Sequence, residues 1–231
     1  MPEVIFNGPE GRLEGRYQAG KTPDAPLALI LHPHPQMPNG NMNNRVSYTL
    51  FQTFAALGFS VLRFNFRGVG RSQGVYDAGV GELSDAAAAL DWLQMQNKDA
   101  KTCWIAGYSF GAWIGMQLLM RRPEIAGFIS VAPPANTKDF MFLAPCPASG
   151  LIIHGGADEQ IPEASVCALA DKLSGQRNVH IDYKLFAHAN HEFDNHLRDM
   201  SLCVGEYVKA AQMKKHRKPK AKIAKKPAPK A

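Results

Sequence analysis

Cysteine is scarce in this sequence of 231 residues, which contains only Cys103, Cys146, Cys167 and Cys203. They are widely spaced, with no CxxC pair and no histidine at zinc-site spacing, so neither a disulfide framework nor a metal site is expected. Free cysteine is among the most buried residue types, and cytoplasmic proteins keep it reduced. The sequence therefore predicts reduced, mostly buried cysteines in a cytoplasmic protein.

Long hydrophobic runs are also missing. The longest apolar stretches, at 27–31, 125–132 and 151–153, are far too short to cross a bilayer. Met1-Pro2-Glu3-Val4 has no basic segment followed by an apolar one, which a signal peptide requires. We therefore expect no membrane span and no secretion signal.

Acidic residues are absent from the last part of the chain. Residues 214–231 carry nine Lys and Arg and no Asp or Glu, which leaves 17 basic against 20 acidic residues in the rest. The net charge of +6 thus comes from a Lys/Pro/Ala-rich tail on a mildly acidic body. We expect residues 213–231 to be disordered, because so charged and proline-rich a segment cannot pack.

The body of the chain, residues 1–212, alternates short apolar strand patterns with amphipathic helix patterns. Such alternation predicts an α/β fold in which a mostly parallel sheet has helices on both faces. Only the segment 133–147 could form a small lid, so no cap domain is expected. The expected strands are 4–6, 12–17, 27–31, 60–66, 101–107, 125–131, 150–154 and 179–186, and the expected helices are 42–57, 81–96, 112–120, 163–173 and 191–212.

The strongest local motif is Gly107-Tyr108-Ser109-Phe110-Gly111. It lies between an apolar strand pattern and a helix pattern, the context of a Gly-x-Ser-x-Gly turn that exposes a nucleophilic serine. The flanking glycines are explained by backbone crowding, which a β-carbon would worsen. We predict that Ser109 is a nucleophile, against the alternative of a glycine-rich turn with an idle serine.

An activated serine needs a base, and a carboxylate must hold that base in place. In this arrangement the three residues follow one another along the chain in the order Ser, Asp/Glu, His. Asp158 stands just after the strand 150–154, at the edge of the sheet where Ser109 is expected. Glu159 is its nearest competitor, and a loop or helix-capping carboxylate is the structural alternative. We predict that Asp158 is the acid.

The base must be a histidine after the last strand, because a neutral imidazole can take the serine proton at neutral pH. The sequence offers His188, His191 and His196 within nine residues. Hydrogen-bonded surface histidines are the alternative reading for each of them. Spacing alone does not separate His191 from His188. We predict His191 as the base and rank His188 second, mainly on the family resemblance described below and on general-base logic.

Two backbone N–H groups must bind the oxyanion, one from the residue after the nucleophile and one from the loop after an early strand. Phe110 supplies the first. In the loop after residue 31, Pro33 and Pro35 have no N–H. The amide of His34 therefore follows as the second donor, ahead of that of Gln36, unless the segment is only a rigid turn.

A glycine-punctuated loop at 67–74 lacks both GxxxxGK[ST] and GxGxxG, so we interpret it as structural and expect no nucleotide cofactor. Together with residues 31–35 and 107–111, the segment 63–72 resembles small, capless bacterial α/β-hydrolases. These are related to dienelactone hydrolase and to the family that includes the KANL3/Tex30-like hydrolase domain. The likeness extends from Val4 to Val208 and implies that Asp158 and His191 are the acid and base. Dienelactone hydrolase itself uses a cysteine, so its substrate is not carried over.

These observations predict a serine hydrolase that cleaves a carboxylic ester or thioester of unknown identity through an acyl-enzyme intermediate. Two other classes stay open: an inactive hydrolase fold that serves as a binding module, and a body whose basic tail contacts nucleic acid or anionic surfaces. The tail has no aromatic residue to stack on bases, so such contact would not be sequence-specific.

Overall fold

A single twisted sheet organises the molecule. The computed structural model describes residues 2–216 and contains an eight-stranded sheet of order β1-β2-β4-β3-β5-β6-β7-β8. The hairpin β1–β2 is antiparallel and joins β4, whereas β4, β3, β5, β6, β7 and β8 run parallel to one another. The strands are β1 (Glu3–Gly8), β2 (Gly11–Gln18), β3 (Leu27–Leu31), β4 (Ser60–Phe64), β5 (Cys103–Tyr108), β6 (Ile125–Val131), β7 (Gly150–Gly155) and β8 (Ile181–Phe186).

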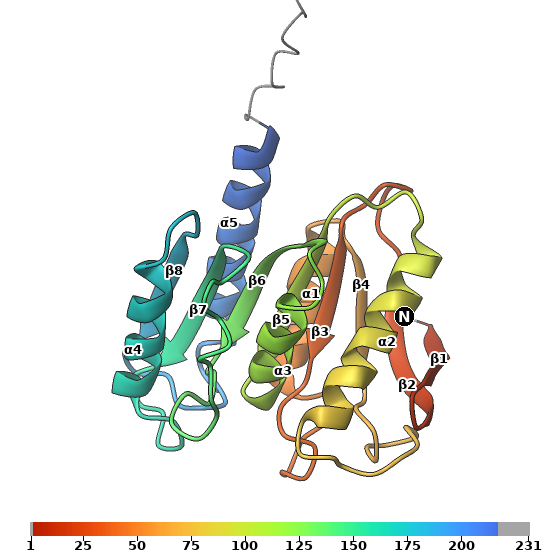
Figure 1. Cartoon of the computed structure of the whole chain (residues 1–231), viewed down its shortest axis with the longest axis horizontal. Coiled ribbons are helices and arrows are strands. Elements are labelled where there is room, and N and C mark those ends of the chain that lie inside the picture. The colour runs from red at the N-terminus through yellow and green to blue at the C-terminus, as the bar shows by residue number, and fades with distance from the viewer. Residues whose placement is uncertain (1, 217–231) are drawn as a thin grey trace, which may run out of the picture.

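Helices cover both faces of this sheet. In Figure 1, α2, α3 and α4 lie in front of the strands, and α1 and α5 lie behind them. The predicted α/β fold without a cap domain is thus confirmed. The helices are α1 (Arg45–Ala56), α2 (Val80–Gln96), α3 (Phe110–Leu119), α4 (Glu163–Ser174) and α5 (Leu197–His216).

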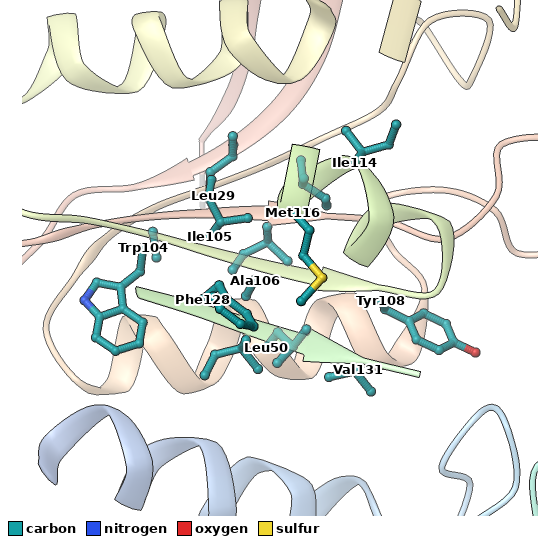
Figure 2. Close-up of a cluster of buried hydrophobic side chains, with 14 of the residues drawn as sticks. Leu29, Leu50, Trp104, Ile105, Ala106, Tyr108, Ile114, Met116, Phe128 and Val131 are labelled. Atoms are coloured by element: carbon teal, nitrogen blue, oxygen red, sulfur yellow. The ribbon is translucent and has the colours of Figure 1, made fainter. Parts of the chain in front are cut away.

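The central strands are apolar along their whole length because both of their faces are covered. All five residues of β3 are buried between β4 and β5. Figure 2 shows how the core extends on either side: Leu50 of α1 packs on one face, and Ile114 and Met116 of α3 pack on the other. This packing fixes the ends of the strands, from which the loops with polar side chains start.

The order of the strands reverses at β3. The chain passes from β3 to β4 on one side and then returns to place β5 on the other side of β3. The loops that leave the carboxyl ends of β3 and β5 therefore separate, one toward each face. In open α/β sheets a crevice for ligands forms at such a point.

The last helix begins later than expected. The sequence predicts a start at residue 191, whereas the helix begins at Leu197. Residues 187–196 instead form turns, with Phe193 in the left-handed region at φ 54°, so His191 lies on a loop. Helix α5 continues to His216, and residues 217–231, most of the tail expected to be disordered, lie outside the described residues.

No helix within residues 2–216 is both long enough and apolar enough to span a membrane.

The glycine-punctuated loop after β4 is held by a buried ion pair. Arg67 donates to Asp85 of α2 through Nε (3.0 Å), one terminal nitrogen (2.8 Å) and its backbone amide (3.0 Å). This use of Arg67 agrees with the structural interpretation of the loop.

Candidate active site

Ser109 stands on a sharp turn between β5 and α3. Its backbone has φ 52° and ψ −118°, a conformation that residues other than glycine rarely adopt. A β-carbon on Gly107 would lie 2.3 Å from the carbonyl oxygen of Gly111, and one on Gly111 would lie 2.4 Å from that of Leu31. The two glycines are therefore required for the turn, and the turn lifts the serine above the carboxyl end of β5.

Asp158 and His191 meet at the same edge of the sheet. Asp158 follows β7 and His191 follows β8, two neighbouring parallel strands. Their side chains are joined by a hydrogen bond of 2.7 Å between Nδ1 of His191 and Oδ2 of Asp158. The carboxylate has no exposed surface and the imidazole is 9% exposed, so the pair is shielded from water, which strengthens the interaction.

Asp158 is held as a carboxylate by its hydrogen bonds. Burial alone would raise its pKa, but the bond to His191 and the amides of Ile161 and Gln160 outweigh burial and lower the pKa. These two amides donate to Oδ1 at 3.0 and 2.9 Å, respectively. With Oδ1 satisfied by the backbone, Oδ2 is left to orient the imidazole.

His154, at the end of β7, lies behind this pair. It is fully buried, its Nε2 is 3.0 Å from the carbonyl of Ile161, and its Nδ1 is 3.9 Å from Oδ2 of Asp158. Burial lowers its pKa more than the neighbouring Asp158 raises it. The neutral ring therefore donates to Ile161 and fixes the loop that carries the carboxylate.

The competing residues lie elsewhere. His188 and Glu159 are exposed, and His196 packs against the edge of Phe186 with ring centroids 6.3 Å apart. Within residues 2–216 none of the three makes a hydrogen bond to Asp158 or His191. Of the histidines in this loop, His191 is the one paired with the carboxylate.

Tyr108 is a residue of the site that the sequence analysis missed. It is fully buried, and Figure 2 shows its hydroxyl pointing away from the hydrophobic cluster. Burial, reinforced by the nearby carboxylate of Glu192, raises the pKa of Tyr108 well above its ordinary value, so the hydroxyl stays protonated. It donates to the backbone carbonyl of His191 at 3.1 Å. The residue beside the serine thus holds the loop of the histidine.

The serine and the histidine share a cavity of about 50 Å³. In the described part of the chain no hydrogen bond joins the Ser109 hydroxyl to the imidazole. Such bonds are often long in an enzyme without substrate and shorten when the substrate binds. The cavity is bounded by Pro33, His34, Met37, Pro38, Tyr108, Ser109, Gln160, His191 and Glu192.

Two backbone amides beside the serine are free to bind an oxyanion. Phe110 is the first residue of α3, so its N–H has no partner within the helix. Among residues 2–216 neither this amide nor that of His34 donates a hydrogen bond, whereas the amide of Gln36 is 3.2 Å from Nδ1 of His34. Of the two candidates in this loop, Gln36 is therefore engaged and His34 is available.

The loop of His34 is fixed by another histidine. His32 is completely buried, with Nδ1 2.7 Å from the carbonyl of Pro33, and its Nε2 accepts the amide of Phe66 at 3.0 Å. Burial lowers the pKa of His32 to about 3, even though the bond to Pro33 opposes this. A neutral ring with one donor and one acceptor ties the loops after β3 and β4 together, and this tie sets the position of the His34 amide.

A larger cavity, of about 350 Å³, opens beside the serine. Its walls come from the loop after β3, the start of α3, the loop after β7 and residues 134–138, which belong to the segment 133–147 considered above as a small lid. Its lining is mostly apolar. It is formed by His34, Met37, Ser109, Phe110, Pro134, Asn136, Thr137, Lys138, Gln160 and Ile161.

Comparisons with known sequences and structures relate this chain to other proteins. The model of a family described as X-Pro dipeptidyl-peptidase (S15 family) matches residues 20–155. An uncharacterized protein of Rickettsia prowazekii is 50% identical over 220 residues, which cover 94% of this chain and 92% of that protein.

Two crystal structures extend the comparison. A protein of unknown function from Agrobacterium tumefaciens, named as a candidate alpha/beta hydrolase, is 56% identical with a TM-score of 0.89, over 95% of this chain and 100% of its own. A serine hydrolase without a lid from Xanthomonas campestris is 30% identical with a TM-score of 0.79, over 90% and 94%. The finer likeness to dienelactone hydrolase stays a prediction. The chain belongs to the α/β serine hydrolase superfamily, within the family that the S15 model describes.

Proposed function

We propose that this enzyme hydrolyses a carboxylic ester or thioester through an acyl-enzyme on Ser109. The observation that carries the proposal is the buried hydrogen bond of 2.7 Å between His191 and Asp158, together with the small cavity that His191 and Ser109 both line. A serine hydroxyl is a weak nucleophile by itself, and an adjacent imidazole oriented by a carboxylate activates it.

In the first half of the reaction, Oγ of Ser109 attacks the carbonyl carbon while its proton passes to Nε2 of His191. Asp158 stabilises the imidazolium through Nδ1. The amides of Phe110 and His34 bind the oxyanion. Collapse of the tetrahedral intermediate breaks the bond to the alcohol or thiol, which leaves with the proton from His191. Water then attacks the acyl-enzyme by the same route and releases the acid.

The direct test is covalent labelling by a fluorophosphonate probe, which reacts with an activated serine. We expect wild type to be labelled and Ser109→Ala not to be, whereas Ser84→Ala, which changes an exposed serine of α2, keeps the label. Wild type that resists the probe would support the alternative of an inactive fold. Label retained by Ser109→Ala would place the nucleophile elsewhere.

Substrate class is tested by turnover. A series of 4-nitrophenyl esters with acyl chains of increasing length is compared with glycyl-prolyl-4-nitroanilide, because the matching family model is described as a dipeptidyl-peptidase. We expect the esters to be hydrolysed and the anilide to be a poor substrate. Faster release of nitroaniline than of nitrophenol would assign the acyl-enzyme to a peptidase instead.

A further inference from the structure

The larger cavity beside Ser109 combines an apolar lining with a single charged side chain. Met37, Pro134 and Ile161 are among its apolar lining residues, and Lys138 is its only Lys, Arg, Asp or Glu among the described residues. A mostly apolar pocket with one charged group is the usual arrangement for orienting a small ligand. The ammonium of Lys138 is therefore the charged group that a ligand in this cavity would meet.

The ammonium is held in place but not neutralised. Nζ of Lys138 lies 4.5 Å from the centroid of the Trp113 ring, which is itself fixed by a bond of 3.0 Å from Nε1 to the carbonyl of Asp139. In the described part of the chain no carboxylate forms an ion pair with Lys138. The carboxylate of Asp139, its neighbour, accepts the amide of Met141 at 2.7 Å. A half-buried cation therefore lacks an anionic partner from the protein.

The positive charge of Lys138 acts on the end of the cavity where Ser109 lies. Burial is the main cause of the lowered pKa of the His34 side chain, and the positive charge of Lys138 is the next. His34 also lines the small cavity with Ser109 and His191. The ammonium thus contributes positive potential to the same space that the substrate must enter.

The position of His191 indicates which half of the substrate this cavity receives. In the proposed reaction His191 protonates the leaving group, so the leaving group must lie on its side of Ser109. Of the two cavities beside Ser109, only the small one is lined by His191. The larger cavity lacks His191 and is lined by Phe110, one of the two proposed oxyanion donors, together with Ser109 and His34, which line both cavities. This places the larger cavity on the acyl side of Ser109.

We propose that the preferred substrates are esters or thioesters whose acyl chain ends in a carboxylate, such as monoesters of linear dicarboxylic acids, with the carboxylate facing Lys138. This inference rests on the proposed function and specifies its substrate class. The methylene groups of such a chain would contact the apolar walls. The terminal carboxylate would supply the anionic partner that the cation lacks.

The test uses pairs of substrates that differ only in the terminal charge. Monomethyl glutarate, adipate and pimelate are compared with methyl pentanoate, hexanoate and heptanoate, and acid release is followed in a pH-stat. We expect wild type to favour one of the monoesters over its uncharged partner by roughly 10- to 100-fold in kcat/KM, the usual effect of a charge-assisted hydrogen bond.

Variants assign this preference to Lys138. Lys138→Met should abolish it mainly by raising KM for the charged ester, because a binding contact remote from the reacting atoms acts on ground state and transition state alike. Lys138→Arg should retain most of it. The matched control is Lys184→Met, since Lys184 also lies over an aromatic ring, 5.9 Å from the centroid of Phe186, but outside the cavity. This control should keep the full preference.

Different results would overturn the role of Lys138 and the proposed ester hydrolysis. Equal kcat/KM for charged and uncharged esters, or a preference that Lys138→Met retains, would overturn the assignment of Lys138 while leaving the ester hydrolase intact. Failure to hydrolyse any ester, together with failure of Ser109 to react with a fluorophosphonate, would overturn both.

Discussion

Single residues that cannot be replaced without moving the backbone fix the geometry around the serine. Gly107 and Gly111 approach other backbone atoms so closely that any side chain would displace the turn. Tyr108, between Gly107 and Ser109, uses its protonated hydroxyl to hold the backbone of His191. Ser109 and His191, the proposed nucleophile and base, are thus positioned by neighbouring residues of one short motif.

Gly107→Ala should destabilise the protein by about 1–3 kcal/mol, the usual cost of overpacking a close-packed site. It should also slow fluorophosphonate labelling, because the turn that presents Ser109 must move. Gly175→Ala is the matched control, since Gly175 has an ordinary φ of −70° and no contact nearer than 3.6 Å. Urea unfolding and labelling rates measure both effects. Equal midpoints for the two variants would contradict the steric argument.

Asp158→Asn should reduce kcat for ester hydrolysis by roughly 10³- to 10⁴-fold with little change in the unfolding midpoint. The amide can occupy the same volume, but it cannot stabilise the imidazolium of His191 or hold the correct tautomer. Glu159→Gln removes a carboxylate from the adjacent, exposed position and should keep nearly full activity. Comparable losses in the two variants would show that the acid had been assigned wrongly.

At the scale of structural elements, the loops depend on polar contacts that connect one strand end to the next. His32, after β3, receives the amide of Phe66, after β4. Arg67, in that second loop, is bound to Asp85 of α2. Fully buried groups of this kind are stable only in one protonation state, so the connection is expected to depend on pH.

Stability should fall on acidification because His32 is neutral in the folded protein. Burial lowers its pKa to about 3, whereas an unfolded histidine has a pKa of about 6.5. Between these values only the unfolded chain binds the proton. The contribution is therefore complete above pH 6.5 and is lost as the pH falls toward 3, at up to about 1.4 kcal/mol per pH unit.

Urea midpoints between pH 7.5 and 5 test this expectation in a range where few carboxylates titrate. His32→Gln can keep one of the two hydrogen bonds, so it should be less stable at pH 7.5 but less sensitive to pH. Parallel curves for wild type and variant would exclude His32 as a source of the dependence.

At the scale of the whole molecule, the topology places the proposed catalytic groups at one edge of the sheet and the end of α5 at the other. Residues after the carboxyl ends of β5, β7 and β8 supply Ser109, Asp158 and His191. Helix α5 starts near this edge and returns past the opposite one, where Tyr207 and Ala211 line a cavity with residues from the starts of β5 and β6. The C-terminal end of α5 thus lies away from the site.

Removing residues 217–231 should therefore leave ester hydrolysis and the urea midpoint unchanged. We expect the truncation to lose salt-dependent retention of DNA, because the removed segment carries seven of the nine Lys and Arg of residues 214–231. Retention on a DNA column over a salt gradient measures this. Equal retention of the two proteins would exclude a role for these charges in binding anionic partners.

Local sequence patterns were sufficient to predict the α/β fold, its strands and the serine turn, because the alternation of apolar residues and the glycine spacing of the turn are properties of short segments. The rule that parallel strands end at one edge was sufficient to nominate Asp158 and a nearby histidine. Only the tertiary structure pairs His191 rather than His188 with that carboxylate. It also finds the Gln36 amide engaged, gives Tyr108 its role and places Lys138 in the larger cavity beside Ser109. These depend on distances between segments far apart in the chain, which packing of the whole core decides.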